Sequence, residues 1–288
     1  MVPSRDDAGP TAPQADPGGE VELLRDLDRP RAWMLLAGGV LQSHVDLDDP
    51  LHLELEYIRR LGHLCDLAGP AGLPLRVLHL GGGGLTLARY VAASRAGSAQ
   101  VAVESDPQVA GLVLGKLPLE RNGPRAGRID VHVADARAAL ARLPARSFDL
   151  VIVDVFVAGS TPAHLTSAEF TAAAARVLAP AGIYAANIGD GPPLAHARGR
   201  IAAVRSVFRH VCLIAEPAVL GGRRFGNLVV AGARRELPVA GLIRRAAADP
   251  FPARVVEGTA LERFVAAAAP ITDARAAPSP VPPPEAFT

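Results

Sequence analysis

Acidic side chains follow three apolar stretches of this chain: Glu104 comes after VAV, Asp135 after VHVA and Asp154 after LVIV. Glycine lets a backbone approach a ligand closely, and carboxylates accept hydrogen bonds from ribose hydroxyls or from the amino group of a base. Another apolar stretch, LRVLHL, runs directly into Gly81, Gly82, Gly83 and Gly84. This combination indicates a site for a nucleotide or an S-adenosyl cosubstrate.

Asp154 is also a candidate proton acceptor. It lies between Val153 and Val155, and apolar surroundings raise the pKa of a carboxyl group toward the range that suits a general base. The structural alternative is that Asp154 caps the loop VAGSTPAH, and that Asp135 and Glu104 are only a helix cap and a turn former. His164 lies in the same loop, where a lone histidine is more often incidental.

The glycines alone do not identify the ligand. A dinucleotide site would also explain the glycines and Glu104, but Leu85, Thr86 and Leu87 stand where the third glycine of the dinucleotide motif would fall. We therefore rank an NAD site behind an S-adenosyl site.

Predicted strands and helices alternate from Leu75 onward. Such alternation is typical of a parallel sheet covered on both faces, with ligands outside the carboxyl ends of the strands. The TSAE sequence of residues 166–169 is typical of a capping box at a helix start. The predicted strands are LRVLHL, AQVAVES, IDVHVA, FDLVIVD and GIYAANI, with helices from Leu85, after Pro107, after Asp135, from about Ser167 and from about Leu194.

Both ends of this alternating region carry antiparallel signals. HVCLIAE and RRFGNLVVAGA are predicted strands joined by a loop, which indicates a hairpin at the sheet edge. Near the N-terminus, residues 33–45 predict a hairpin around Gly38 and Gly39, and residues 51–66 predict a helix. The predicted fold class is α/β: a methyltransferase-like Rossmann fold with a mostly parallel sheet, a C-terminal antiparallel hairpin and a small N-terminal β-hairpin.

Composition divides the chain into five segments. Residues 1–20 and 273–288 are rich in proline and small residues, and we expect a disordered leader and a disordered, solvated tail. Residues 21–70 hold the hairpin and its helix, residues 71–235 form the S-adenosyl-binding domain, and residues 236–272 form a helical extension. The exposed edge of the hairpin favours a homodimer.

Net charge and composition limit the classes of molecule that the protein is expected to bind. The 288 residues carry 30 basic and 29 acidic side chains, for a net charge of +1, so no surface for nucleic acid or an anionic membrane is indicated. Only Cys65 and Cys212 are present and the eight histidines lack metal-ligand spacing, so we expect neither a disulfide nor a metal. The N-terminus has no signal-peptide pattern and no long apolar run follows, which predicts a cytoplasmic protein acting on a small molecule.

The chain resembles a known family over residues 32–233. The spermidine/spermine synthases, or aminopropyltransferases, carry similar motifs in the same order: GGVLQS, VLHLGGGG, VAVESDP, VADA, FDLVIVDVF, LTSAEFTAAAARVLAPAGIYAANI and FGNLVVAG. The resemblance implies a methyltransferase-like sheet, a small N-terminal β-element used in dimerisation, and decarboxylated S-adenosylmethionine as aminopropyl donor.

The resemblance also implies a role for each candidate residue. Glu104 is similar to the ribose ligand of the family, Asp135 and Ala136 to the adenine contact, and Gln42 to the glutamine beside the sulfur of the cosubstrate. Asp154 is similar to the acid that removes a proton from the attacking amine.

Three acids of the family are missing here. Gly84 stands where an aspartate holds the ammonium of the donor, Val157 where an acid binds the far amine of a diamine, and Arg59 where a glutamate follows the tyrosine that corresponds to Tyr57. Burying a dication without carboxylates costs several kcal/mol. We therefore expect putrescine to be a poor substrate, and we expect Gly84 to leave room for the carboxylate of ordinary S-adenosylmethionine.

Three functions remain open at this point. The first is a spermidine-synthase-like transferase that moves an aminopropyl or alkyl group from S-adenosylmethionine or its decarboxylated form to an amine. The second is a methyltransferase that uses S-adenosylmethionine in the same pocket. The third is a catalytically inactive interaction protein that retains the fold.

Overall fold

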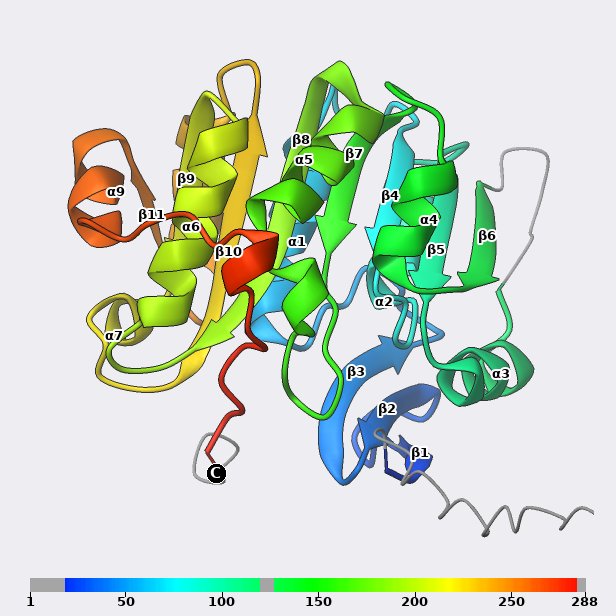
Figure 1. The fold of residues 1–288 in the computed structure, drawn as a ribbon. Helices are drawn as coiled ribbons and strands as arrows, with labels where there is room; N and C mark the ends of the chain where they lie inside the picture. Colours follow the sequence, from blue (N-terminus) through cyan, green and yellow to red (C-terminus); the bar gives the residue numbers. More distant parts are fainter. Residues whose placement is uncertain (1–18, 120–126, 284–288) are drawn as a thin grey trace, which may run out of the picture.

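A computed structural model of the protein describes residues 19–119 and 127–283. Its main sheet has eight strands in the order β11-β9-β10-β8-β7-β4-β5-β6 (Figure 1). The five neighbours from β8 to β6 run parallel, as predicted. The bounds of the strands are β4 (Arg76–Leu80), β5 (Ala99–Glu104), β6 (Arg128–Val133), β7 (Phe148–Val153), β8 (Leu178–Asp190), β9 (His210–Ala215), β10 (Gly226–Ala233) and β11 (Arg254–Glu257).

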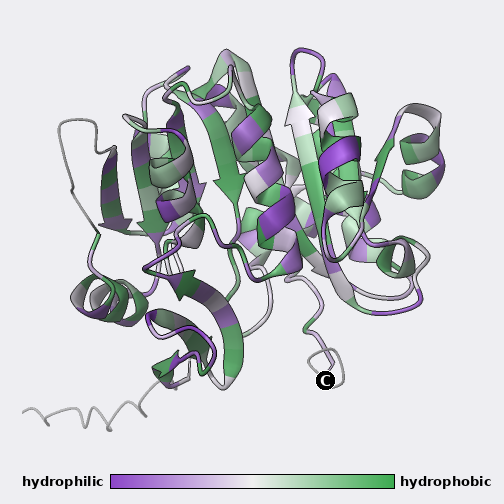
Figure 2. Ribbon diagram, turned by 180° about the vertical axis from the view of Figure 1, so that it is seen from behind, coloured by the Kyte–Doolittle hydropathy of each residue, from purple (hydrophilic) through white to green (hydrophobic). Residues whose placement is uncertain are grey.

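Helices cover both faces of this sheet. One face packs against α4 (Ala136–Arg142), α5 (Ala168–Val177) and α6 (Ala195–Val207), and the other against α1 (Glu56–Leu67), α2 (Thr86–Ser94) and α8 (Val239–Ala248). The central strands are hydrophobic along their length (Figure 2) because alternate residues serve the two cores: Val151 and Val153 face one, Leu150 and Ile152 the other. The remaining helices are α3 (Pro107–Lys116), α7 (Pro217–Leu220) and α9 (Gly258–Val265).

The C-terminal hairpin of β9 and β10 is antiparallel, as predicted, but it does not form the edge of the sheet, as the sequence had indicated. β10 lies between β8 and β9 and is antiparallel to both, and β11 pairs with β9 to form the edge. β11 is a four-residue strand, RVVE, inside the segment predicted to be helical. Its short sequence carries little periodicity, and the backbone of β9 supplies the pairing that holds it.

The N-terminal element is a three-stranded sheet of β1 (Val21–Arg25), β2 (Ala32–Ala37) and β3 (Val40–Asp46). The predicted hairpin is β2 and β3, with Gly38 at φ 58° and Gly39 at φ 77°, the left-handed pair that a tight two-residue turn needs. β1 was not predicted, and α1 begins at Glu56, five residues later than expected. The small sheet lies below the carboxyl ends of β4 and β5 (Figure 1).

The C-terminal tail was predicted to be solvated. In its described part, residues 273–283, most side chains are exposed, but Ser279 is only 4% exposed and its Oγ accepts from the Thr161 N–H. The capping box is also wrong: Ser167 caps α5 by accepting from the Phe170 N–H at 3.1 Å, and Glu169 instead accepts from the Asp273 N–H at 3.0 Å. The predicted leader, residues 1–20, lies outside the described residues up to position 18.

Two further expectations concern cysteines and membranes. Cys65 and Cys212 are buried and unpaired, and burial raises the pKa of each thiol to about 12. None of the helices in the described ranges combines the length and apolar character needed to cross a membrane.

Candidate functional site

A cavity of about 430 Å³ lies at the carboxyl ends of β4, β5, β6 and β7, with β2 and β3 forming one wall. This is the size of many ligand clefts, about 300 to 1,000 Å³. Parallel strands end at one edge of a sheet, which is why residues far apart in the sequence meet here. The predicted site residues that line the cavity are Gln42, Gly81, Gly82, Gly83, Glu104, Asp135, Ala136 and Asp154.

Glu104 holds the glycine loop in shape. One carboxylate oxygen, Oε2, accepts from the N–H of Gly82 at 3.0 Å and of Gly83 at 2.9 Å, and Oε1 accepts from the N–H of Asp106 at 2.9 Å. A carboxylate has about four acceptor positions, so one remains for a ligand hydroxyl. Glu104 therefore supports the loop and can also contact a ribose.

Gly84 is the exception among the predicted residues. It is buried, does not line the cavity, and donates its N–H to Ser43 Oγ at 3.0 Å. A Cβ atom at Gly84 would lie 2.7 Å from Val45 Cγ2 and 3.0 Å from Ser43 Cβ. The expectation that Gly84 leaves room for a ligand carboxylate is wrong, because β3 fills that space.

Restoring the family aspartate at this position is expected to harm the protein. Gly84→Asp should destabilise folding by about 1–3 kcal/mol, since the new side chain must displace the stiff, buried Val45. Urea denaturation would measure the loss. Val45→Ala should recover part of it, and Gly111→Asp, at a helix position with open space around its Cβ, should cost little. Unchanged stability of Gly84→Asp would contradict the packing argument.

Asp154 lies at the end of β7 with one oxygen, Oδ1, accepting from Asn187 Nδ2 at 3.0 Å. Burial raises the pKa of Asp154 to about 6, and the hydrogen bond from Asn187 opposes that rise. The phenol of Tyr57 is close enough that, after burial, the charge of Asp154 helps to raise its pKa well above the ordinary value. Tyr57 therefore stays protonated beside the candidate base.

Asn187 was not predicted as a site residue. It lies inside β8, three residues before the strand ends at Asp190, and the residues after it are buried as well, so no strand-end pattern in the sequence marks it. Its Nδ2 binds Asp154, while its Oδ1 is buried without a hydrogen-bond partner in the described structure. Asn187 therefore orients one side of the candidate base.

Asp135 caps α4 and meets His164. Its Oδ1 accepts from the Ala138 N–H at 2.9 Å, and its Oδ2 lies 2.6 Å from His164 Nε2. Burial alone would raise the pKa of Asp135, but these hydrogen bonds hold it below the ordinary value. The sequence analysis treated His164 as incidental, but it lines the cavity and contacts Asp135, the residue predicted to bind adenine.

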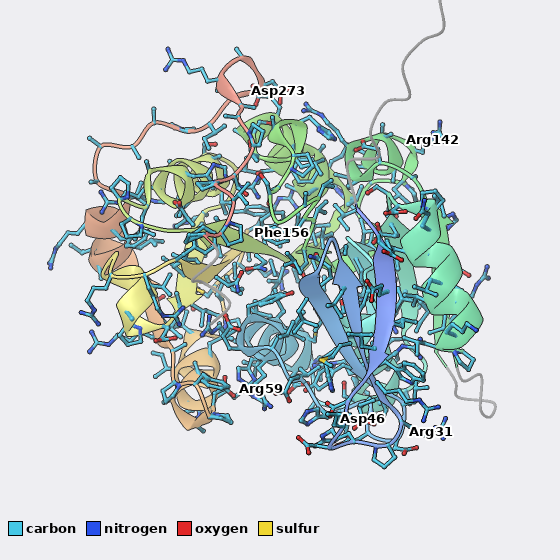
Figure 3. All side chains as sticks on the ribbon, turned by 90° about the horizontal axis from the view of Figure 1, so that it is seen from below. Arg31, Asp46, Arg59, Arg142, Phe156 and Asp273 are labelled. Carbon is cyan, nitrogen blue, oxygen red and sulfur yellow. The ribbon has the colours of Figure 1, made fainter. Side chains whose placement is uncertain are left out.

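The wall beyond Asp154 is apolar. Figure 3 views this edge of the sheet, with Phe156 near the middle of the face and Arg59 well separated from it. Val157 lines the cavity, whereas Arg59 does not. Within the part of the chain that the structure describes, the Nε atom of Arg59 is buried without a hydrogen-bond partner. The residues that form the wall are Tyr57, Ile58, Ile152, Val155, Phe156, Val157 and Ala158.

The charged side chains that line the cavity are mainly acidic. Its described lining contains four carboxylates and no lysine or arginine, and burial lowers the pKa of the lining residue His79 to about 4. Such a site attracts a cation, for example a sulfonium, and repels the pyrophosphate of a dinucleotide. The four carboxylates belong to Glu104, Asp106, Asp135 and Asp154.

Metal ligands do not gather here. Within residues 19–119 and 127–283, no group of three or more His, Cys, Asp or Glu side chains is arranged to hold an ion.

Comparison with known proteins agrees with this geometry. Residues 54–227, more than half of the chain, match the family model of the spermine/spermidine synthase domain. The chain belongs to the spermine/spermidine synthase family. A probable spermidine synthase from Corynebacterium glutamicum is 32% identical, with a TM-score of 0.80 over 88% of this chain and 92% of that protein.

Two further relatives of this family member are more distant. The polyamine aminopropyltransferase of Chromobacterium violaceum is 29% identical over 157 residues, 54% of this chain and 57% of that protein, so the match spans little more than half of its length. The spermidine synthase of Thermotoga maritima, 17% identical with a TM-score of 0.56 over 85% of this chain and 80% of that one, shares the fold. The α/β, methyltransferase-like fold class is thus confirmed.

Proposed function

We propose that the protein is a spermidine-synthase-like transferase that binds an S-adenosyl cosubstrate and transfers an aminopropyl or alkyl group to an amine. The observation that carries the proposal is the cavity itself, whose described lining holds four carboxylates and no lysine or arginine, with the partly buried Asp154 at a strand end among them. A positively charged sulfonium complements this lining. Glu104 would contact the ribose, Asp135 and Ala136 the adenine, and Gln42 the sulfur end.

The proposed step is an in-line displacement at a carbon bonded to sulfur. The amine nitrogen forms a bond to that carbon, and the carbon–sulfur bond breaks with its electron pair remaining on sulfur, which leaves a neutral thioether. The proton lost by the amine passes to Asp154, whose other oxygen is held by Asn187. Because the sulfonium is already a good leaving group, the protein mainly aligns the nucleophile and accepts its proton.

The apolar wall supports an acceptor with one reactive amine and an uncharged remainder. Val157 and Phe156 offer no carboxylate to a second ammonium group, so putrescine should be a poor acceptor. Ser43 and Val45 fill the space beside Gly84, which removes the argument for a donor that retains its carboxylate. We therefore place aminopropyl transfer before methyl transfer.

Ligand-induced thermal stabilisation tests the proposal. Methylthioadenosine, decarboxylated S-adenosylmethionine and S-adenosylmethionine should each stabilise the protein, by roughly 2.7 kcal/mol at a hundred times the dissociation constant, whereas NAD should not. Glu104→Ala should abolish the shift, and Glu22→Gln, on the exposed side of β1, should preserve it.

Transfer itself would then be followed with labelled donor against a panel of monoamines and diamines. Product with monoamines in preference to putrescine is the expected result. If no adenosine compound stabilises the protein, the enzyme proposal fails and the inactive interaction protein becomes the better hypothesis.

A further inference from the structure

The loop between β7 and α5 forms the wall next to the candidate base, and we name residues 155–165 the acceptor loop. Its regular structure is limited to the short 3-10 turn Ala163–Leu165 and a reciprocal pair of hydrogen bonds between Val157 and Ser160, at 2.8 and 3.0 Å. Ala158 and Gly159 at its tip have φ values of 49° and 77°. Few bonds within the acceptor loop therefore fix the position of its tip.

A second segment, near residue 280, makes the hydrogen bonds that hold the acceptor loop in place. We name residues 271–283 the C-terminal strap, which runs beside the acceptor loop (Figure 1). The Ser279 N–H donates to the Thr161 carbonyl at 3.0 Å, and the Thr161 N–H donates to Ser279 Oγ at 2.8 Å. Ser160 Oγ donates to the Ser279 carbonyl at 2.5 Å. The backbone and side chain of Ser279 thus bind the loop at three points.

These contacts are shielded from water. Ser279 is 4% exposed and Thr161 is 5% exposed. Pro282 packs against the tip, since a Cβ atom at Gly159 would lie 3.2 Å from Pro282 Cδ. Buried hydrogen bonds hold a position more firmly than exposed ones, because water cannot replace a lost partner.

The strap is itself anchored before it reaches the loop. Its Ile271 carbonyl accepts from the Ala168 N–H at 2.8 Å, which ties it to the start of α5. Arg137 binds both carboxylate oxygens of Asp273, at 2.8 and 2.5 Å, and also donates to the His164 carbonyl at 3.0 Å. Asp273 lies at the rim of the face seen in Figure 3. The strap is therefore fixed to the start of α5 and to Arg137 of α4 before it contacts the acceptor loop.

We propose that Ser279 is a positioning residue that fixes the acceptor loop and so shapes the acceptor side of the cavity. Its contacts fall on residues 160 and 161, two and three residues after Ala158, the last of the wall residues of this loop. No hydrogen bond of Ser279 reaches the glycine loop, Glu104 or Asp135 in the described structure. Because Ser279 makes no hydrogen bond to the residues assigned to the nucleoside, we expect its loss to affect acceptor binding more than nucleoside binding. This role rests on the proposed function.

Steady-state kinetics of Ser279 variants test the role. Ser279→Ala should raise the KM for the acceptor about tenfold, the loss expected for a buried hydrogen bond, and leave the Kd for methylthioadenosine within about twofold. Ser279→Thr keeps the hydroxyl and should restore most of the acceptor KM. Arg275→Ala, an exposed strap residue, should behave as the native protein.

Hydrogen exchange of the protein without ligand gives a readout that does not depend on the reaction. Amides of residues 155–165 should exchange faster in Ser279→Ala and at the native rate in Arg275→Ala. Unchanged exchange, or an equal loss of nucleoside and acceptor binding, would overturn the positioning role. Failure of the native protein to bind any nucleoside would instead reject the proposed function, and exchange would still show whether Ser279 holds the loop.

Discussion

Asp154→Asn is expected to lower turnover by about 10²- to 10⁴-fold, the usual contribution of a general base, with the Kd for methylthioadenosine near the native value. Asparagine keeps the size of the side chain and its contact with Asn187 but cannot accept the proton of the amine. Asp149→Asn is the matched control, because Asp149 lies at the opposite end of β7 and pairs with Arg76. Native turnover in Asp154→Asn would remove the base from the mechanism.

Asp154 should also set how the rate of transfer and the stability of the fold depend on pH. With a pKa of about 6, Asp154 becomes protonated as the pH falls through about 6. The rate of transfer should fall over the same range, because the protonated carboxyl group is no longer a base. Its folded-state pKa is raised above the ordinary 3.8, so its contribution to stability is present at pH below about 4 and is lost as the pH rises through 6. Asp154→Asn should therefore stabilise the fold at pH 8 by up to about 3 kcal/mol and have little effect at pH 4. Thermal unfolding at the two pH values would measure the difference.

Gly81→Ala is expected to destabilise the fold by about 3–5 kcal/mol, a range reached when backbone strain and a buried clash coincide. Gly81 has a φ of 96°, and a Cβ atom there would lie 1.9 Å from the carbonyl oxygen of Asp154. Either the glycine loop or the end of β7 must move, so the candidate base should be displaced as well.

Urea denaturation and methylthioadenosine binding would measure both consequences of this change. Gly111→Ala is the control, since nothing lies within 4 Å of its Cβ position in α3 and alanine favours a helix by roughly 0.5–1 kcal/mol over glycine. A Gly81→Ala protein of native stability would show that the two strand ends are not packed as the structure has them.

The parts of the site that the sequence predicts are those set by strand order. Glu104, Asp135 and Asp154 each follow an apolar strand, and the parallel sheet brings the three strand ends to one cavity. β11 was missed because a four-residue strand is stabilised by β9 and not by its own pattern.

Other features depend on contacts between distant segments. Gly84 was misinterpreted because Ser43 and Val45, which fill the space beside it, come from the separate N-terminal sheet. The proline-rich composition of residues 273–283 shows that this segment cannot form a core of its own. It does not show that Thr161 offers a partner to Ser279.

The hydrogen bonds from the glycine loop to Glu104 bear on the speed of ligand capture. Glu104 Oε2 accepts from the N–H groups of both Gly82 and Gly83, so hydrogen bonds within the protein hold the glycine loop in one shape. If the proposed nucleoside binds at this loop, we expect its association rate to be limited by encounter and not by a slow isomerisation of the loop.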